Sequence, residues 1–324
     1  MPLALLEVTA GRNLEAFLGL PAGDTLASLF RPEFEGRQRA WVAVVGDKPR
    51  ARIVARRSPV LKDLGMLGFF EALPGSEEEV ARLFEASIHW LRETGAGEIV
   101  GPMDGDTWHK HRLNVGPWDD PPFLMEPWNP PYYPELWESN GFEVLERYLS
   151  KRVESGLVAD FLEPKRQAAL AAGYRLRRME PAKFVDELRT IYRISVRIFA
   201  RNFLYTEISE QEFFALYAGA RGLLDPDFVW FAQSPEGEDV GFLFAFPDGF
   251  QGKTDAVNMK TIGVLPEHRR AGLGAALMGQ AHRIAQEKGY RFANHCLFRE
   301  GNPSGEMDGG TGRVMRNYHL YRLA

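Results

Sequence analysis

The chain contains the same run of elements twice, and this repetition limits the folds available to it. Leu73-Pro74 is followed by a helix with apolar periodicity, then by Glu93-Thr94-Gly95 and a short strand. Leu265-Pro266, 192 residues later, is followed by a helix of the same pattern, then by Glu287-Lys288-Gly289 and a strand. Two copies of one strand-loop-helix-strand unit are expected. The alternative is a chance similarity of two amphipathic helices.

The length of 324 residues agrees with this duplication, because two domains of about 150 residues each are the usual expectation for such a chain. Hydrophobic residues make up 45% and charged residues 26%, which is typical of a globular protein with an ample core. We therefore place one domain at residues 1–160 and a second at residues 161–324.

Composition also weighs against several classes of partner. A net charge of -5 weighs against nucleic acid, and the single Cys296 excludes an internal disulfide framework and suits a reducing compartment. No apolar run approaches the length of a membrane span, and the first residues lack the layout of a signal peptide. We expect a cytoplasmic monomer or homodimer without nucleic-acid or membrane partners.

A basic, glycine-bearing turn joins strand and helix in the second copy. Arg269 and Arg270 precede Gly272 and Gly274, and the apolar-periodic helix begins near Leu273. The N–H groups at a helix start have no intrahelical partner and the helix dipole adds positive charge, so this turn predicts a phosphate site. The alternative is a glycine-rich helix start that serves only tight packing.

The wider string from Val264 to Leu277 follows the pattern V-x-P-x-x-R-x-x-G-x-G-x-x-L. This pattern resembles the acyl-CoA-binding motif of the GCN5-related N-acetyltransferase (GNAT) superfamily. A Walker loop would need Gly-Lys-Ser/Thr, and a Rossmann turn would need a third glycine. The segments Gly101-Pro102-Met103 and Asn129 to Leu136 extend the resemblance to a group of uncharacterised bacterial proteins with two GNAT-like domains. It implies an α/β fold of the α+β type, with two tandem domains, each a mixed, mostly antiparallel twisted sheet flanked by helices.

The resemblance further implies acetyl-CoA, or another acyl-CoA, as cosubstrate, without a metal. Ile262, Gly263 and Val264 would pair with the pantetheine arm through their backbone. Asn302 would touch the pantetheine, or else serve only as a turn residue. The cradle of the pyrophosphate would consist of Arg269, Arg270, Ala271, Gly272, Leu273, Gly274 and Ala275.

The implied reaction is acyl transfer from the thioester to a small-molecule or peptide amine, which needs a base for the amine and often an acid for the thiolate. Many family members use a glutamate as base where this chain has Asn258. His295 on the following strand is a candidate base, or a structural histidine. Tyr318 on the final strand is a candidate acid, or a packing residue. Catalysis by positioning alone remains an alternative.

The first copy lacks the basic turn. Gly75 to Glu79 carry three acids, and we expect Ser76 and Glu79 to form a capping box that satisfies the helix start. The first domain is therefore predicted not to bind CoA. Its segment 101–134 is rich in proline and aromatic residues, and we expect it to line or cover a site. The alternative is a flap packed on its own domain.

In the second half we expect a strand, two helices, three strands, a helix, a strand, a short helix and a strand, the order of a GNAT domain. Residues 154–172 are expected to form a connector that is helical only around 164–170. The second helix of this half is expected to span residues 210–218.

Two functions remain open at this point. The first is an acyl-CoA-dependent N-acyltransferase, and the second is a non-catalytic acyl-CoA-binding or sensor protein, favoured by the missing glutamate and tyrosine. Tandem halves also resemble myristoyl transferases and peptidoglycan transferases that use aminoacyl-tRNA. The acidic balance weighs against the tRNA-dependent class.

Overall fold

The computed structural model describes residues 2–20, 29, 31–217, 219, 221, 224–249, 252 and 255–324. The chain divides into two compact units. Unit 1 consists of Met1–Val115, Pro127–Arg147 and Tyr318–Ala324, and unit 2 of Gly116–Glu126 and Tyr148–Asn317. The predicted boundary at residue 160 falls inside a helix of unit 2, and a division at that residue stays a prediction.

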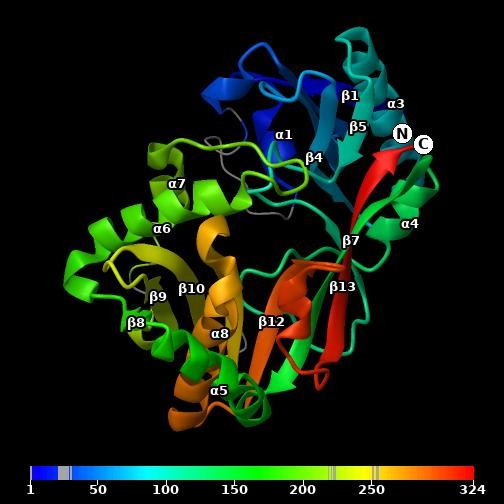
Figure 1. Cartoon of the computed structure of the whole chain (residues 1–324). Helices are drawn as coiled ribbons and strands as arrows, with labels where there is room; N and C mark the ends of the chain where they lie inside the picture. Colours follow the sequence, from blue (N-terminus) through cyan, green and yellow to red (C-terminus); the bar gives the residue numbers. More distant parts are fainter. Residues whose placement is uncertain are drawn as a thin grey trace. The chain divides into compact units, whose positions relative to one another are not determined.

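Unit 1 contains a sheet in the order β1-β2-β3-β4-β5, followed by the C-terminal end of β13 (Figure 1, blue to cyan and the red end). β4 and β5 pair in parallel, and the other described pairs are antiparallel. The elements of this part of the chain are β1 (Leu3–Val8), α1 (Leu14–Leu18), η1 (Pro32–Phe34), β2 (Gln38–Val45), β3 (Lys48–Arg57), β4 (Leu64–Ala72), α3 (Glu77–Glu93), β5 (Glu98–Gly101), β6 (Leu113–Gly116) and α4 (Tyr133–Glu138).

Unit 2 contains a sheet in the order β7-β12-β11-β10-β9-β8, in which β11 and β12 form the parallel pair. Its elements are β7 (Phe142–Glu154), which begins in unit 1, α5 (Ser155–Ala171), β8 (Arg175–Arg178), η2 (Pro181–Lys183), α6 (Phe184–Phe199), α7 (Glu210–Tyr217), η4 (Pro226–Phe228), β9 (Val229–Gln233), β10 (Asp239–Pro247), β11 (Ala256–Val264), η5 (Pro266–Ala271), α8 (Leu273–Glu287), β12 (Phe292–Arg299), η6 (Pro303–Glu306) and β13 (Arg313–Leu323), which ends in unit 1.

In each unit, one strand of the sheet comes from the end of the other half of the sequence. β7 follows the first half, yet it pairs with β12 of unit 2 through Phe292↔Glu154 and His295↔Lys151. β13 follows the second half, yet it pairs with β5 of unit 1 through Tyr321↔Gly101. The two halves therefore exchange their final strands within one chain.

The structure confirms the predicted fold class. Both units are α/β in content and of the α+β type, and each has a mixed, mostly antiparallel sheet with helices packed on it. The predicted order of elements in the second half is also confirmed.

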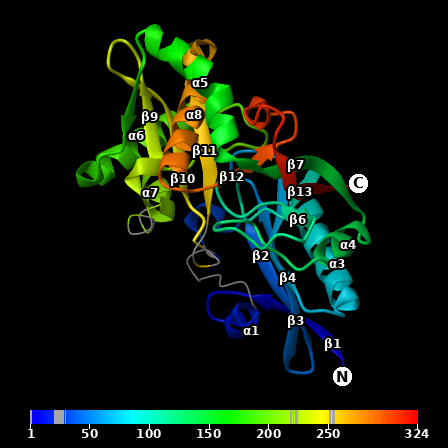
Figure 2. The same ribbon diagram turned by 90° about the horizontal axis from the view of Figure 1, so that it is seen from below.

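Residues 154–172 differ from the prediction, because α5 is one helix through Pro164 rather than a partly helical connector. α5 packs along α8, and Figures 1 and 2 show the two helices side by side. Gly279 of α8 permits this approach, since a Cβ there would lie 3.1 Å from Leu162. Packing thus outweighs the cost of an interior proline. The predicted end of α7, Ala218, lies outside the described residues.

Helices of unit 2 pack closely on the central strands. α8 packs on β9, β10 and β11, and α6 packs on β10 and β11. Gly263 of β11 is required for this packing, because a Cβ there would lie 1.9 Å from Ile198 Cδ1 of α6. Over the ranges of the chain that the structure describes, we find no helix with both the length and the apolarity to cross a bilayer.

Candidate acyl-CoA site

The start of α8 is shaped by one glycine. Gly272 is the N-cap residue and adopts φ 73° and ψ 14°, a left-handed conformation that costs glycine little and other residues more. Its carbonyl accepts from Ala276 N–H, whereas no side chain in the described residues caps the helix. The first N–H groups, of Leu273, Gly274 and Ala275, therefore remain for an anion.

The two arginines before this turn differ in their contacts. Arg269 Nε donates to the carbonyl of Val264 at 3.2 Å, so this side chain braces the end of β11. Arg270 is exposed and has no hydrogen bond or ion pair to any described residue. Arg270 is therefore the cation that is available to a phosphate.

A free strand edge adjoins the turn. Leu265 N–H donates to Val240 O of β10, and alternation along an antiparallel ladder then turns the backbone groups of Ile262 and Val264 away from β10. On that side β12 pairs with β11 only as far as Met259↔His295. Backbone groups of Ile262 and Val264 thus face an edge that β12 does not fill, next to the uncapped helix start.

This geometry, a free strand edge leading into an uncapped, glycine-started helix, can be compared with known families. The family model described as Acetyltransferase (GNAT) domain matches residues 225–305. That range includes β11, the turn, α8 and β12. The chain therefore contains a GNAT domain.

Other proteins match this GNAT chain over most of its length. A bacterial ceramide synthase from Caulobacter vibrioides is 23% identical over 270 residues, covering 76% of this chain and 70% of that protein. A GCN5-related N-acetyltransferase from Sphaerobacter thermophilus has a similar structure, with TM-score 0.51 and 14% identity over 98% of this chain and 95% of that one. A tandem GNAT protein from the clavulanic acid biosynthesis pathway gives TM-score 0.54 and 12% identity over 99% and 98%. These structural likenesses support the fold of a tandem GNAT protein.

His295 lies beneath α8 in this GNAT protein. Its Nε2 is 2.8 Å from Nε2 of His282, and both rings are buried. Burial lowers the pKa of His295 to about 4, and burial together with His295 lowers the pKa of His282. Both imidazoles are therefore neutral at pH 7, with one proton shared between the facing nitrogens. The role of His295 as a base stays a prediction.

Tyr318 and Asn302 are the other predicted polar residues. Tyr318 is fully buried on β13 and belongs to unit 1. Asn302 is the N-cap of η6, and its Oδ1 accepts from Ser304 N–H and from Ser304 Oγ, both at 3.0 Å. Neither observation tests the roles of Tyr318 in catalysis or of Asn302 in binding pantetheine, which stay predictions.

Unit 1 has the same strand edge, but it is filled. Leu73 N–H donates to Arg50 O, so Ala72 is turned away from β3 as Val264 is from β10. Ala72 N–H donates to Tyr133 Oη at 2.8 Å, and Tyr132 Oη donates to Ala72 O at 2.7 Å. Two hydroxyls from the chain itself thus bind both backbone groups of Ala72, whereas at the matching position of unit 2 the Val264 carbonyl accepts from Arg269. The sequence showed the Tyr132-Tyr133 pair but not its target.

The predicted capping box of unit 1 is wrong. Ser76 is the N-cap of α3, but its side chain makes no capping hydrogen bond. Its Oγ donates instead to the Arg50 carbonyl at 3.4 Å, and Glu79 lies 3.9 Å from Arg50 in an ion pair. Arg50 therefore competes for both members of the box. The acids of the first turn of α3 remain as predicted.

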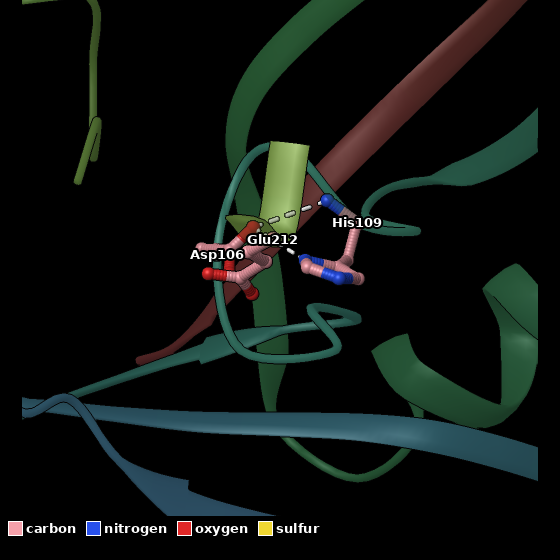
Figure 3. A group of neighbouring side chains, drawn as sticks. All are labelled: Asp106, His109 and Glu212. Atoms are coloured by element: carbon pink, nitrogen blue, oxygen red, sulfur yellow. Dashed lines mark hydrogen bonds and ion pairs between the residues drawn. The ribbon is translucent and has the colours of Figure 1, made fainter. Parts of the chain in front are cut away.

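The proline-rich segment 101–134 is divided between the units. Residues 116–126 belong to unit 2, and the rest belongs to unit 1. In the unit 1 part, Asp106 Oδ1 accepts from His109 Nδ1 at 2.8 Å (Figure 3), and Arg31 donates to Asp106 Oδ2 at 3.0 Å. Burial opposes ionisation of Asp106, but His109 and Arg31 outweigh it and lower its pKa to about 2. Glu212, also drawn there, is part of α7 in unit 2.

Proposed function

We propose that this protein is an N-acyltransferase that takes its acyl group from acyl-CoA, bound by unit 2. The observation that carries this proposal is the uncapped start of α8 at Gly272 beside the free edge at Ile262 and Val264. A pyrophosphate suits the N–H groups and Arg270, and the amides of a pantetheine arm suit an unpaired strand edge. Membership of the GNAT superfamily supports the same use of both features.

In the proposed reaction the acceptor nitrogen attacks the thioester carbonyl. An N–C bond forms, the C–S bond breaks, and the proton lost by the amine ends on the departing thiolate, through water or a side chain. Unit 2 would contribute mainly by holding the thioester in position along β11. Arg269 supports this by fixing the end of β11 through Val264.

Acetyl-CoA, or another acyl-CoA, is proposed as donor, and an amine as acceptor. The relative from Caulobacter vibrioides is a ceramide synthase, and a ceramide is the amide of a long-chain amino alcohol. That relative supports N-acylation, and it adds long-chain amino alcohols to small amines and peptide amines as acceptors to be tested.

The proposal is tested by titrating the protein calorimetrically with CoA and acetyl-CoA, and then by mass spectrometry of amine mixtures incubated with acyl-CoA. We expect one CoA per chain and an amide product with one class of amine. Gly272→Asp should weaken CoA binding about 100-fold and reduce amide formation with it, because it places a carboxylate at the pyrophosphate. An absence of CoA binding by the wild-type protein would refute the proposal.

A second candidate function is acyl-CoA binding without transfer. Asn258 occupies the position at which many GNAT proteins carry a glutamate base, and His295 lies under α8 in contact with His282. A protein of this class would bind CoA at one site per chain but yield no amide with any amine. The same two measurements therefore separate the two functions.

A further inference from the structure

β11 and β12 separate at a defined rung. They pair in parallel as far as Met259↔His295, and both strands continue beyond it. β11 carries a register shift against β10 at Lys260, and β12 carries one against β7 at Cys296 and Leu297. Such bulges bend a strand and end its pairing. The free edge of β11 therefore leads from the helix start to the point where the two strands, neighbours in Figure 2, part.

The two faces of the sheet differ at this point. His295 faces α8, where it meets His282. Side chains alternate along β12, so Cys296 and Asn294 lie on the opposite face, and the register places Asn258 beside Asn294. A ligand group that lies along the free edge of β11, where β11 and β12 part, would thus have α8 on one face of the sheet. On the other face it would meet polar and apolar side chains.

Asn258 offers an unused donor on that second face. Arg152 Nε donates to Asn294 Oδ1 at 3.0 Å, and since arginine only donates, this bond fixes the orientation of the Asn294 amide. Asn294 Nδ2 then donates to Asn258 Oδ1 at 2.8 Å, which leaves Asn258 Nδ2 buried without a partner among the described residues. A buried hydrogen-bond donor without a partner is rare in folded proteins, and it indicates a ligand or a functional role. The Oδ1 atom of Asn258 lies 3.9 Å from the Cys296 sulfur.

A segment from the first half of the chain covers this face. We call residues 116–126 the strap. Arg316 of β13 holds it through Glu126 Oε1 at 3.0 Å and the carbonyl of Asp120 at 2.7 Å, and both charged side chains of the Arg316–Glu126 pair are fully buried. Leu124 N–H donates to Asp248 Oδ1 at 3.0 Å beyond the end of β10. Arg316 and Asp248 thus hold the strap in place through three of its residues.

Phe123 is the strap residue that meets the point of separation. Its buried side chain packs with Cys296 and Met315, and Leu297 packs against this cluster. Cys296 is also the first residue of β12 beyond the last paired rung. The phenyl ring therefore fills the space next to the place where the free edge of β11 ends.

We propose that the acyl group of the donor binds beside Asn258 and Cys296, and that Phe123 ends this site and so restricts the donor to short acyl chains. This inference rests on the proposed function. Asn258 Nδ2 supplies a hydrogen bond to the acyl carbonyl oxygen, and Phe123 occupies the volume into which a longer chain would extend. A chain too long for a packed site forces shifts that cost affinity.

Calorimetric titration with CoA, acetyl-CoA and hexanoyl-CoA tests the proposal without an identified acceptor. Wild-type protein should bind hexanoyl-CoA about tenfold more weakly than acetyl-CoA. Phe123→Ala should remove this preference while the affinity for free CoA stays unchanged. Phe228→Ala, an equally buried truncation at the other end of α8, is the matched control and should keep the preference. Phe123→Leu, a milder change, should give an intermediate result if Phe123→Ala fails to fold.

A second substitution tests the hydrogen-bond donor of Asn258. Asn258→Asp keeps an acceptor for Asn294 and removes the unpaired N–H, so it should reduce the advantage of acetyl-CoA over free CoA about tenfold. The inference would be overturned if wild-type protein bound hexanoyl-CoA as well as acetyl-CoA, or if Phe123→Ala kept the wild-type preference. Failure of all three ligands to bind would instead overturn the proposed function.

Discussion

The starts of α3 and α8 are two versions of one local structure, and they differ in what they leave free. α3 begins with Glu77, Glu78 and Glu79 in its first turn, whereas α8 begins after Arg269 and Arg270 and has no acid there. An anion is therefore repelled at one helix start and attracted at the other.

The strand edges beside these helices differ in the same sense. Ala72 of β4 is hydrogen-bonded by Tyr132 and Tyr133, whereas β12 leaves the edge of β11 beyond Met259 unpaired. Unit 1 thus differs in two independent ways, in charge and in edge occupancy, from the acyl-CoA site proposed in unit 2. The difference shows that side chains can fill the backbone groups of a strand edge while the strand-loop-helix unit keeps its fold.

The largest effect is expected from Gly272→Asp. Aspartate tolerates a positive φ better than most residues, so the fold should survive, while its carboxylate meets the pyrophosphate. We expect the Kd for CoA to rise about 100-fold, roughly 3 kcal/mol. Calorimetry measures this change. Gly75→Asp is the control, since Gly75 has φ +70° in the matching loop of unit 1, and it should leave CoA affinity unchanged.

Acid should destabilise unit 2 through its buried pair His282–His295. This pair has no counterpart on α3 of unit 1. The folded pKa of His295, about 4, lies below the ordinary value of 6.5, so the unfolded chain binds more protons between these pH values. Stability is therefore fully present above pH 6.5 and falls as the pH is lowered towards 4, by roughly 3 kcal/mol.

Urea unfolding at pH 7 and pH 4.5 checks this prediction. His295→Asn should flatten the difference between the two pH values, whereas His89→Ala, at an exposed position of α3, should not. Equal acid sensitivity of His295→Asn and the wild-type protein would show that other groups cause the loss.

Tyr133→Phe probes the filled edge of unit 1. It removes the acceptor of Ala72 N–H and the donor to Glu71 Oε2, at 2.8 Å each, and leaves a buried N–H unpaired. We expect a loss of about 1–3 kcal/mol in the free energy of unfolding and no change in CoA affinity. Tyr132→Phe, which gives up the bond to Ala72 O, should cost less because Tyr132 is only half-buried. A second bound CoA in Tyr133→Phe would mean that the tyrosine alone closes unit 1.

The smallest effect is expected at Arg270. Its guanidinium is exposed and makes no hydrogen bond or ion pair with the described residues, so Arg270→Ala should weaken CoA binding about threefold to tenfold without loss of stability. The effect should shrink as salt is added, because the charge is exposed. Arg82→Ala, at an exposed position of α3, serves as control and should have no effect at any salt concentration.

Much of the second half was predictable from local pattern. The order of the elements and the start of α8 match the expectations, because hydrophobic periodicity and a glycine at the helix start are properties of a few neighbouring residues. The full length of α5 was not predictable, since Pro164 argues against it and only packing against α8 overcomes that. The capping box at Ser76 failed for the same kind of reason, because Arg50, distant in sequence, takes its hydroxyl.

The sequence by itself determined the position of the turn that we propose as the phosphate site, since Arg270, Gly272 and the helix start lie within one short stretch of chain. Only the tertiary structure decided that the two halves exchange their last strands, that tyrosines fill the edge at Ala72, and that the strap brings Phe123 to Cys296. These pairings join residues dozens to more than a hundred positions apart. They depend on which backbone edges and apolar surfaces remain free after the local elements have formed, and no local pattern records that.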